Sequence, residues 1–245
     1  MIFAPGNSEQ AFYLTQKAFY LSEKYRLPVF ILTDKYLADS VETAKNLNII
    51  KHFQTRFIYE PKTHEEEENY KSYELTENGV SKRVLPGFSN ACAFSDSHTH
   101  DEFGNITESS EIRTKMVEKL FKKEADLIND ISPPYLSDDN IADNLLIGWG
   151  STFGVVRDAC NLLKKRGISI RHLHFHEVYP LETKVLEKVC SQSKKIIMIE
   201  NNYTAQMARL IRAETGIEIT EKILKYDGRP FYLDELSEKI LEKVS

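Results

Sequence analysis

Residues 144–175 read NLLIGWGSTFGVVRDACNLLKKRGISIRHLHF, and this stretch determines the fold class. An apolar run at 144–147 precedes a helical pattern over 152–165, and a second apolar run follows over 168–175. The alternation continues with a helix predicted over 181–190, a strand over 195–199, and helices over 204–214 and 233–244. Strands that alternate with helices of about ten to fifteen residues are typical of a parallel, doubly wound sheet. We therefore predict an α/β fold.

The first 48 residues predict a smaller β-α-β-α piece. Residues 2–4 form its first strand, and a helix follows. The apolar run at 27–33 predicts a strand that is covered on both faces, as in a parallel sheet. A second helix is expected over 34–47. The apolar face of the first helix, at steps of three and four, consists of Ala11, Leu14, Ala18, Leu21 and Tyr25.

The character of the chain changes between about Lys51 and Pro86. Four carboxylates at 65–68 could bind a metal, but charges that repel one another favour a solvated loop. Residues 91–104 predict a loop, and residues 108–131 a long amphipathic helix that ends before Pro133 and Pro134. The apolar face expected for that helix is Ile112, Met116, Leu120, Ala125 and Ile128.

Composition excludes several classes of protein. The chain has 245 residues, of which 41% are hydrophobic, and its 32 basic and 37 acidic residues give a net charge of −5. This balance provides no general attraction to nucleic acid or to anionic lipid. No apolar run is long enough for a membrane helix, and the first residues do not resemble a signal peptide. Three widely spaced cysteines argue against a disulfide framework, a zinc site and an iron–sulfur cluster in this chain. We expect a cytoplasmic protein without a nucleic-acid or membrane partner.

Two motifs of the carboxyl-terminal third have competing interpretations. Residues 148–154 (GWGSTFG) lie between a strand and a helix, where helix amides could hold a phosphate. Their spacing is not that of a dinucleotide fingerprint, so a tight turn capped by Ser151 or Thr152 is favoured over nucleotide binding. His172, His174 and His176 would share one strand face with about 7 Å between neighbours, a row that converges poorly on a metal. His176 and Glu177, near the end of the strand, are the better functional pair.

Two polar loops are further candidates. Residues 96–104 (DSHTHDEFG) combine groups that can transfer protons or hold a polar substrate, although Asp101 and Glu102 could simply cap turns. Residues 200–202 (ENN) follow a strand and precede a helix. They could bind a ligand, but capping of that helix is the default expectation.

Several strings together resemble the alpha subunit of 2-oxoacid:ferredoxin oxidoreductases, particularly the carboxyl-terminal half of the 2-oxoglutarate type. Residues 4–8 (APGNS) and 28–34 (PVFILTD) resemble the last helix and strand of its pyrimidine-binding domain. Residues 100–108 (HDEFGNITE) resemble the family's H-D-E-x-G loop. Residues 200–206 (ENNYTAQ) and 225–231 (KYDGRPF) resemble motifs of its transketolase-like carboxyl-terminal domain, with Ala205 where the family usually has glycine. The resemblance covers nearly the whole chain.

The resemblance implies oxidative decarboxylation of a 2-oxoacid by thiamine diphosphate, with coenzyme A as acyl acceptor and electron transfer through iron–sulfur clusters to ferredoxin. In the complete complex the beta subunit would hold the diphosphate and magnesium, and other subunits the clusters. The family's Tyr-Pro-Ile-Thr-Pro segment, its cofactor glutamate and its Gly-Asp-Gly motif have no counterpart here. We therefore expect that this chain alone binds no thiamine diphosphate and is inactive alone.

The resemblance also implies an organisation and a set of partners. We expect the end of a pyrimidine-type domain at residues 1–48, a linker with an active-site-type loop at 49–132, and a transketolase C-terminal-like, doubly wound parallel sheet at 133–245. The two amino-terminal strands would lack neighbours, as in a split-gene subunit or a shortened product, and the initial Met1 favours the split-gene subunit. Its partners would be the beta subunit and a separate pyrimidine-domain polypeptide, with gamma and ferredoxin-type subunits as further candidates.

The site implied by the resemblance consists of His100, Asp101 and Glu102, facing the active-site cleft. The sequence predicts no cofactor or metal ligands in this chain. Two alternatives remain open. One is a non-catalytic module of the same fold that supplies only subunit contacts, and the other is a nucleotide-binding protein that uses residues 148–154.

Overall fold

The computed structural model describes residues 1–44 and 47–244, which form two compact units. Unit 1 comprises Met1–Ala18, Val29–Ile49 and Ile131–Ser245, and unit 2 comprises Phe19–Pro28 and Ile50–Asp130. Both units are therefore assembled from segments that are distant in the sequence. The division at residues 48 and 132 stays a prediction.

The larger sheet of unit 1 has five strands in the order β3-β5-β4-β7-β8. Four of them run parallel, and β3 pairs with β5 in the antiparallel direction at one edge. The predicted doubly wound parallel sheet is thus confirmed, although the sequence pattern did not reveal β3 and β8. The strands are β3 (Tyr135–Leu136), β4 (Asn144–Trp149), β5 (Ile170–Phe175), β7 (Lys195–Glu200) and β8 (Glu221–Leu224).

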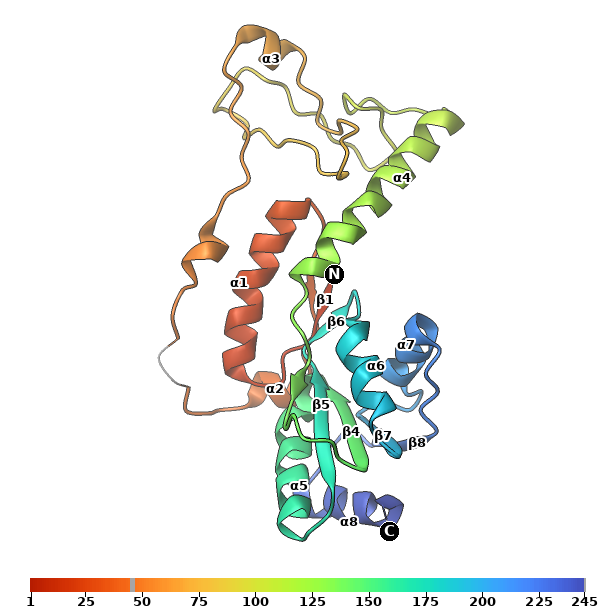
Figure 1. Cartoon of the computed structure of the whole chain (residues 1–245). Coiled ribbons are helices and arrows are strands. Elements are labelled where there is room, and N and C mark those ends of the chain that lie inside the picture. The colour runs from red at the N-terminus through yellow and green to blue at the C-terminus, as the bar shows by residue number, and fades with distance from the viewer. Residues whose placement is uncertain (45–46, 245) are drawn as a thin grey trace. The chain divides into compact units, whose positions relative to one another are not determined.

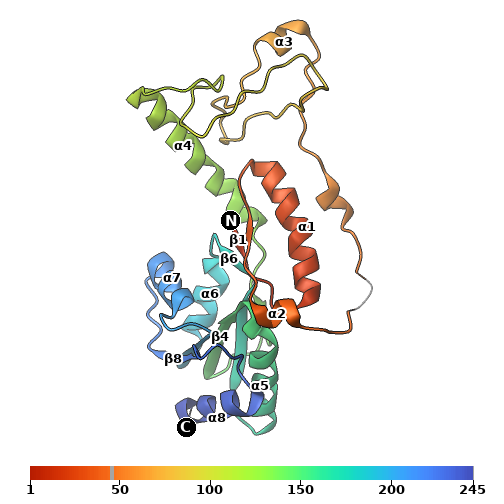
Figure 2. The same cartoon turned by 180° about the vertical axis from the view of Figure 1, so that it is seen from behind.

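Successive residues of the central strands point to opposite faces of this sheet, because side chains alternate along a strand. Leu145 and Ile147 of β4 belong to one apolar cluster, and Leu146 belongs to the other. Helices α6 (Thr183–Ser191) and α7 (Gln206–Thr215) cover the first face, and α5 (Phe153–Lys165) and α8 (Leu233–Val244) cover the second (Figure 1). The reverse view shows the same two layers of helices (Figure 2).

A second, three-stranded sheet of unit 1 has the order β2-β1-β6, with β1 at Ile2–Phe3, β2 at Phe30–Ile31 and β6 at Glu177–Tyr179. β1 is parallel to β2 and antiparallel to β6, so the expectation that β1 would lack neighbours is wrong. β2 is shorter than predicted and is not covered on both faces, since Phe30 is 59% exposed.

The helices that flank β2 only partly follow the prediction. α1 (Ser8–Tyr25) buries its predicted face from Leu14 to Tyr25. The helix expected over 34–47 is wrong in length, because α2 ends at Asp39 (Lys35–Asp39) and Ser40 takes extended backbone angles. Residues 45 and 46 of that prediction lie outside the described residues.

Unit 2 contains α3 (His64–Glu68), α4 (Ser110–Leu127) and the short 3-10 helices η1 (Lys51–Gln54) and η2 (Ile128–Asp130). The loop predicted at 65–68 is a helical turn, since the Thr63 hydroxyl caps it and Glu65–Glu67 favour its amino-terminal end. The apolar face predicted for α4 is wrong. Its buried residues are Lys119, Lys123 and Leu127, whereas Leu120 is 54% exposed.

None of the helices in residues 1–44 and 47–244 is both long and apolar enough to cross a membrane.

Candidate functional site

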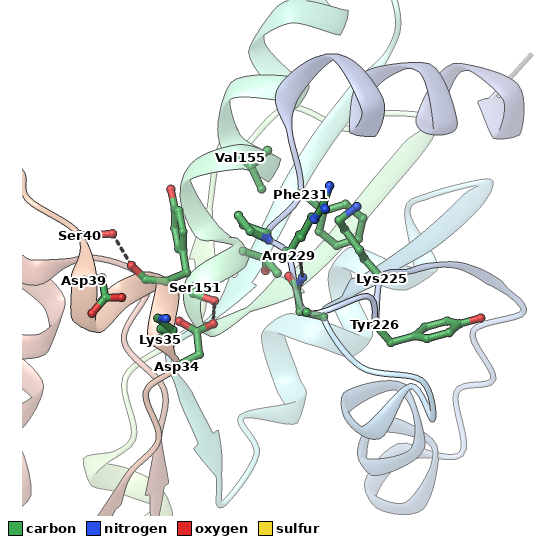
Figure 3. Close-up of a pocket in the computed structure, with 15 residues that line it drawn as sticks. Asp34, Lys35, Asp39, Ser40, Ser151, Val155, Lys225, Tyr226, Arg229 and Phe231 are labelled. Carbon is green, nitrogen blue, oxygen red and sulfur yellow. Dashed lines mark hydrogen bonds between the residues drawn. The ribbon is translucent and has the colours of Figure 1, made fainter.

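The candidate site of unit 1 lies where the chain reverses direction across the larger sheet. β4 is paired with β5 on one side and with β7 on the other, and the chain visits these neighbours in turn. Open α/β sheets bind ligands beyond the carboxyl ends of the strands at such a switch point. A cavity of about 830 Å³ opens there, within the ~300–1,000 Å³ usual for ligand pockets (Figure 3). The segments that line it follow β2, β4, β7 and β8.

The turn after β4 forms the floor of the candidate site. Gly150 begins the 3-10 turn η3 (Gly150–Thr152) with a φ of +57°, in the region that favours glycine. Thr152 closes the turn, because its hydroxyl donates to the Trp149 carbonyl at 2.8 Å and accepts from the Trp149 amide at 3.2 Å. The tight turn favoured from the sequence is therefore confirmed, with Thr152 as the residue that closes it.

A carboxylate lies beside the first turn of α5, where a phosphate would be expected to bind. Asp34 accepts a hydrogen bond from the Ser151 hydroxyl and caps α2 by accepting from the Leu37 amide at 2.9 Å. A second anion at this end of α5 would be repelled by Asp34. The first turn of α5, beyond the carboxyl end of β4, is therefore poorly suited to bind a diphosphate.

The opposite wall of the cavity is formed by residues 225–231, and it carries two cations (Figure 3). Lys225 lies 3.1 Å from Asp227 and 3.0 Å from Glu235, and the hydrogen bond to Glu235 chiefly raises the pKa of this lysine. The Arg229 guanidinium forms no hydrogen bond or ion pair with the described residues. Arg229 is therefore the cation of this wall that can pair with a bound anion, at a distance from Asp34 across the cavity (Figure 3).

Glu200 is fully buried at the end of β7, and its carboxylate caps α7. It accepts hydrogen bonds from the amides of Met207 at 3.0 Å and Ala208 at 3.1 Å, and from the Trp149 indole at 3.0 Å. The capping interpretation of residues 200–202 is thus the one that the structure bears out. Ala205, just before α7, has a φ of +52°, which explains the glycine usual in the family at this position.

The histidine row is part of the core rather than a metal site. His172 and His174 are fully buried on β5, and His172 Nε2 lies 3.3 Å from His174 Nδ1. His176 lies beyond the end of β5, so the three histidines do not occupy one strand as predicted. Glu177 forms an ion pair with buried Lys17 at 2.7 Å, which gives that carboxylate a structural partner. Within residues 1–44 and 47–244 no group of three or more metal-ligating side chains comes together.

His100, Asp101 and Glu102 lie together in unit 2, in a loop that side chains hold in shape. Asp101 Oδ1 accepts hydrogen bonds from the amides of Phe103, Gly104 and Asn105 at 2.9–3.0 Å. Partial burial raises the pKa of Asp101, but the bonds from Asn105, Phe103 and Gly104 outweigh it and hold this pKa below its usual value. Asp101 therefore shapes the turn and is ionised at neutral pH.

The other two loop residues are anchored to the segment at 71–75. The His100 ring stacks on Tyr73 with 4.4 Å between centroids, and its Nε2 lies 2.9 Å from both the amide and the carbonyl of Asp96. Glu102 accepts from the Leu75 amide at 2.9 Å and from Lys71 at 3.2 Å. The bond from Leu75 chiefly lowers the pKa of Glu102. The two ionised carboxylates can only accept hydrogen bonds, whereas an imidazole such as that of His100 can also donate one.

From the sequence, two of the lining segments, 148–154 and 200–202, were weighed as ligand sites but interpreted as a turn and a helix cap, and they were not combined with residues 34–40 and 225–231 into one site. The position of the lining residues in the sequence could have located them, because Ser151, Asn201 and Lys225 each come within two residues of the end of a parallel strand. The sequence motif at 225–231 was visible, but β8 before it was not predicted.

Two families match the chain. Residues 1–119 match "Pyruvate flavodoxin/ferredoxin oxidoreductase, thiamine diP-bdg", and residues 142–236 match "Pyruvate:ferredoxin oxidoreductase core domain II". The order of the two matches agrees with the predicted fold class, a thiamine-enzyme domain followed by a second α/β domain.

Curated relatives extend the similarity over the whole chain. The 2-oxoacid:ferredoxin oxidoreductase 2, subunit alpha, of Aeropyrum pernix is 31% identical over 99% of this chain. The corresponding subunit alpha of enzyme 1 of Sulfurisphaera tokodaii is 33% identical over 100% of it. The chain spans 38% of the length of either relative.

A solved structure has the same fold throughout. The 2-oxoglutarate:ferredoxin oxidoreductase from Magnetococcus marinus, with 2-oxoglutarate, coenzyme A and succinyl-CoA bound, is 26% identical with a TM-score of 0.86. The similarity covers 100% of this chain and 42% of that one. The chain belongs to the family of 2-oxoacid:ferredoxin oxidoreductase alpha subunits.

Proposed function

We propose that the chain acts as the carboxyl-terminal part of an alpha subunit that oxidatively decarboxylates a 2-oxoacid, such as 2-oxoglutarate, to its acyl-CoA. The observation that carries this proposal is the TM-score of 0.86 over 100% of the chain to an enzyme with 2-oxoglutarate and coenzyme A bound. The whole chain, including the polar segment of unit 2, takes part in that similarity. A module that had kept only the sheet of unit 1 would match over a smaller part.

The complete enzyme in this proposal has further components. Thiamine diphosphate supplies the electron sink for decarboxylation, and a beta subunit holds its diphosphate with magnesium. A separate pyrimidine-domain polypeptide completes the cofactor site, and iron–sulfur clusters lie on gamma or ferredoxin-type subunits. The poor fit of the α5 turn to a diphosphate supports this division, because Asp34 places a carboxylate there. The chain by itself is inactive.

The role proposed for unit 2 is to present His100, Asp101 and Glu102 to the active-site cleft, with Asp101 nearest the substrate or the beta subunit. The backbone amides and Lys71 that hold the two carboxylates fix their orientation before any ligand binds. Ionised carboxylates can orient a cationic or hydrogen-bond-donating group, and His100 can hold or release a proton.

Asp101 provides the test. In an enzyme reconstituted from this chain, the beta subunit and the pyrimidine-domain polypeptide, Asp101→Ala should lower turnover of the 2-oxoacid at least tenfold, or about 1.4 kcal/mol. Turnover is measured as 2-oxoacid-dependent reduction of ferredoxin in the presence of coenzyme A. This chain without the other polypeptides should give no reduction.

Asp101→Asn separates a catalytic role from a structural one. Its amide oxygen can still accept the three backbone bonds of the loop, but the negative charge is removed. If the charge acts on substrate or on the beta subunit, Asp101→Asn loses activity as Asp101→Ala does. Near-normal turnover of both variants would remove Asp101 from the site. Normal turnover of a complex from which this chain is omitted would favour the alternative, a non-catalytic module for subunit contacts.

A further inference from the structure

Two lysines of α4 in unit 2 are buried where an amphipathic helix would bury apolar residues. Lys119 and Lys123 are one turn apart and are 7% and 5% exposed. On the same helix Leu120 is 54% and Phe121 is 69% exposed. Burial of a lysine ammonium is costly unless it is paired, so this inverted pattern requires a physical reason.

A third cation faces the same region from the end of α1. Arg26 has a φ of +52°, and one guanidinium nitrogen donates to the carbonyls of Ser72 at 2.7 Å and Lys82 at 3.1 Å. Its guanidinium carbon lies 5.9 Å from the centroid of the Tyr73 ring, and Lys119 Nζ lies 5.8 Å from the same centroid. Arg26 and Lys119 therefore converge on Tyr73.

The surrounding segments enclose the two lysines. Lys119 Nζ donates to the Ser81 hydroxyl. The turn at Gly79 is packed so closely on α4 that a Cβ there would clash with the Lys119 carbonyl oxygen and lie 3.2 Å from Lys123 Cγ. Ser72, whose carbonyl accepts from Arg26, also has a buried Oγ that lacks a hydrogen-bond partner among the described residues.

The charges of this cluster are not balanced by carboxylates. Over residues 1–44 and 47–244, none of Arg26, Lys119 and Lys123 forms an ion pair with a carboxylate. Glu74 and Glu102 act on Lys119 only at longer range, and Glu102 is itself paired with Lys71. Burial is the main cause that lowers the pKa of Lys119 and of Lys123 to about 8. Repulsion by Arg26 lowers both pKa values further, and repulsion by Lys123 also lowers the pKa of Lys119.

We propose that Arg26, Lys119 and Lys123, with the buried Ser72 hydroxyl, form a binding site in unit 2 for a small oxyanion, the group shared by phosphate esters and carboxylic acids. Guanidinium, ammonium and hydroxyl groups are the donors that bind such anions in proteins. Tyr73 contacts both the stacked His100 ring, at 4.4 Å between centroids, and Lys119, whose Nζ lies 5.8 Å from its centroid, so the cluster adjoins the loop at 100–102. The site is independent of the proposed function.

Lys123→Met and Lys122→Met in the full chain form a matched pair for the test. Both remove one positive charge from the same helix, but Lys122 is exposed and Lys123 is buried. Inorganic phosphate and succinate are titrated separately at constant ionic strength, and binding is followed by the shift in Tm and, for phosphate, by ³¹P NMR line broadening. We expect Lys122→Met to bind as the wild type does, and Lys123→Met to bind at least tenfold more weakly.

The Tm measured without any anion gives a second readout, in which Lys123→Met should be an improvement rather than a loss. Without an oxyanion, Lys123→Met should have a higher Tm than the wild type, because it removes a buried charge, and this advantage should shrink as phosphate or succinate is added to both. A response to phosphate alone assigns the site to phosphate groups, and a response to succinate alone assigns it to carboxylates. If wild type, Lys122→Met and Lys123→Met respond equally to both anions, the proposal is overturned.

Discussion

The two buried histidines of β5 have protonation states that their contacts fix. The Gly150 carbonyl, 3.0 Å from His174 Nε2, can only accept, so this nitrogen carries the proton. Burial disfavours a second proton on this ring, so His174 Nδ1 accepts from His172 Nε2, and the buried His172 Nδ1 is left without a partner among the described residues. Both rings are therefore neutral in the folded protein.

Neutral burial of these rings makes stability depend on pH. Burial lowers the pKa of His172 to about 3 and that of His174 well below its usual value of 6.5. Below pH 6.5 the unfolded chain takes up protons that the folded chain excludes, so the free energy of unfolding should fall as pH drops from 6.5 towards 3. The loss is about 1.4 kcal/mol per pH unit for each histidine.

Urea denaturation at pH 7.5 and pH 5.5 measures this slope. His172→Gln, which can still donate to His174, should show a smaller loss of stability between the two pH values than the wild type. His64→Gln is the control, because the His64 side chain is 78% exposed. Equal slopes in wild type and His172→Gln would contradict neutral burial of His172.

Residue identity predicted the polar candidates but not their surroundings. The alternation at 172–174 correctly placed two histidines on one strand face, yet a period of two does not say whether that face meets the core or solvent. At 100–102 the chemistry was visible in the residue types, whereas the partners Tyr73, Lys71 and Leu75 lie about thirty residues away and follow no local pattern. The role of His100, Asp101 and Glu102 in catalysis stays a prediction.

At the level of elements, α7 depends on a single carboxylate. Glu200 accepts from two backbone amides of the first turn of α7, from the Trp149 indole and from the side-chain Nδ2 of Asn202 at 2.7 Å. Glu200→Ala would leave these buried donors unsatisfied and remove the negative charge at the amino-terminal end of the helix. We expect a loss of about 3 kcal/mol or more in the free energy of unfolding, measured by urea denaturation.

Glu187→Ala is the control for this prediction. Glu187 is an exposed residue of α6, and a surface substitution of this kind changes stability by about 0.5 kcal/mol or less. Glu200→Gln, which keeps one acceptor oxygen, should fall between the two. A loss for Glu200→Ala no larger than that of Glu187→Ala would show that the cap is not required.

Helices and strands were predicted most accurately where the apolar residues of the sequence are also the residues that the fold buries. The bounds of α8, 233–244, agree with the prediction because its apolar residues Leu236, Ile240, Leu241 and Val244 pack into the cluster on that face of the sheet. α4 was predicted as a helix with the wrong face, since Lys119 and Lys123 are buried there, although hydropathy places lysine at the surface, and Leu120 is exposed. β3 has only two residues and β8 begins Glu-Lys, so neither shows the continuous apolar run of a buried strand.

On the scale of the whole molecule, the two units are stabilised by different interactions. β4, β5 and β7 of unit 1 are hydrogen-bonded on both sides and buried on both faces. In unit 2 the segment at 69–109 contains no helix or strand other than an isolated bridge, and side-chain bonds such as those of Asp101 and Glu102 hold it. Local opening should therefore cost much less free energy in this segment than in the sheet.

Hydrogen–deuterium exchange of the full chain, read by mass spectrometry, tests this contrast. Peptides from β4, β5 and β7 should exchange slowest, and peptides from 69–109 should exchange at least a hundredfold faster, which corresponds to about 2.7 kcal/mol. Equal protection of both segments would contradict it. If the alpha-subunit role is correct, the beta subunit should slow exchange around residues 100–102, because a loop held mainly by side chains gains most from a partner that fixes it.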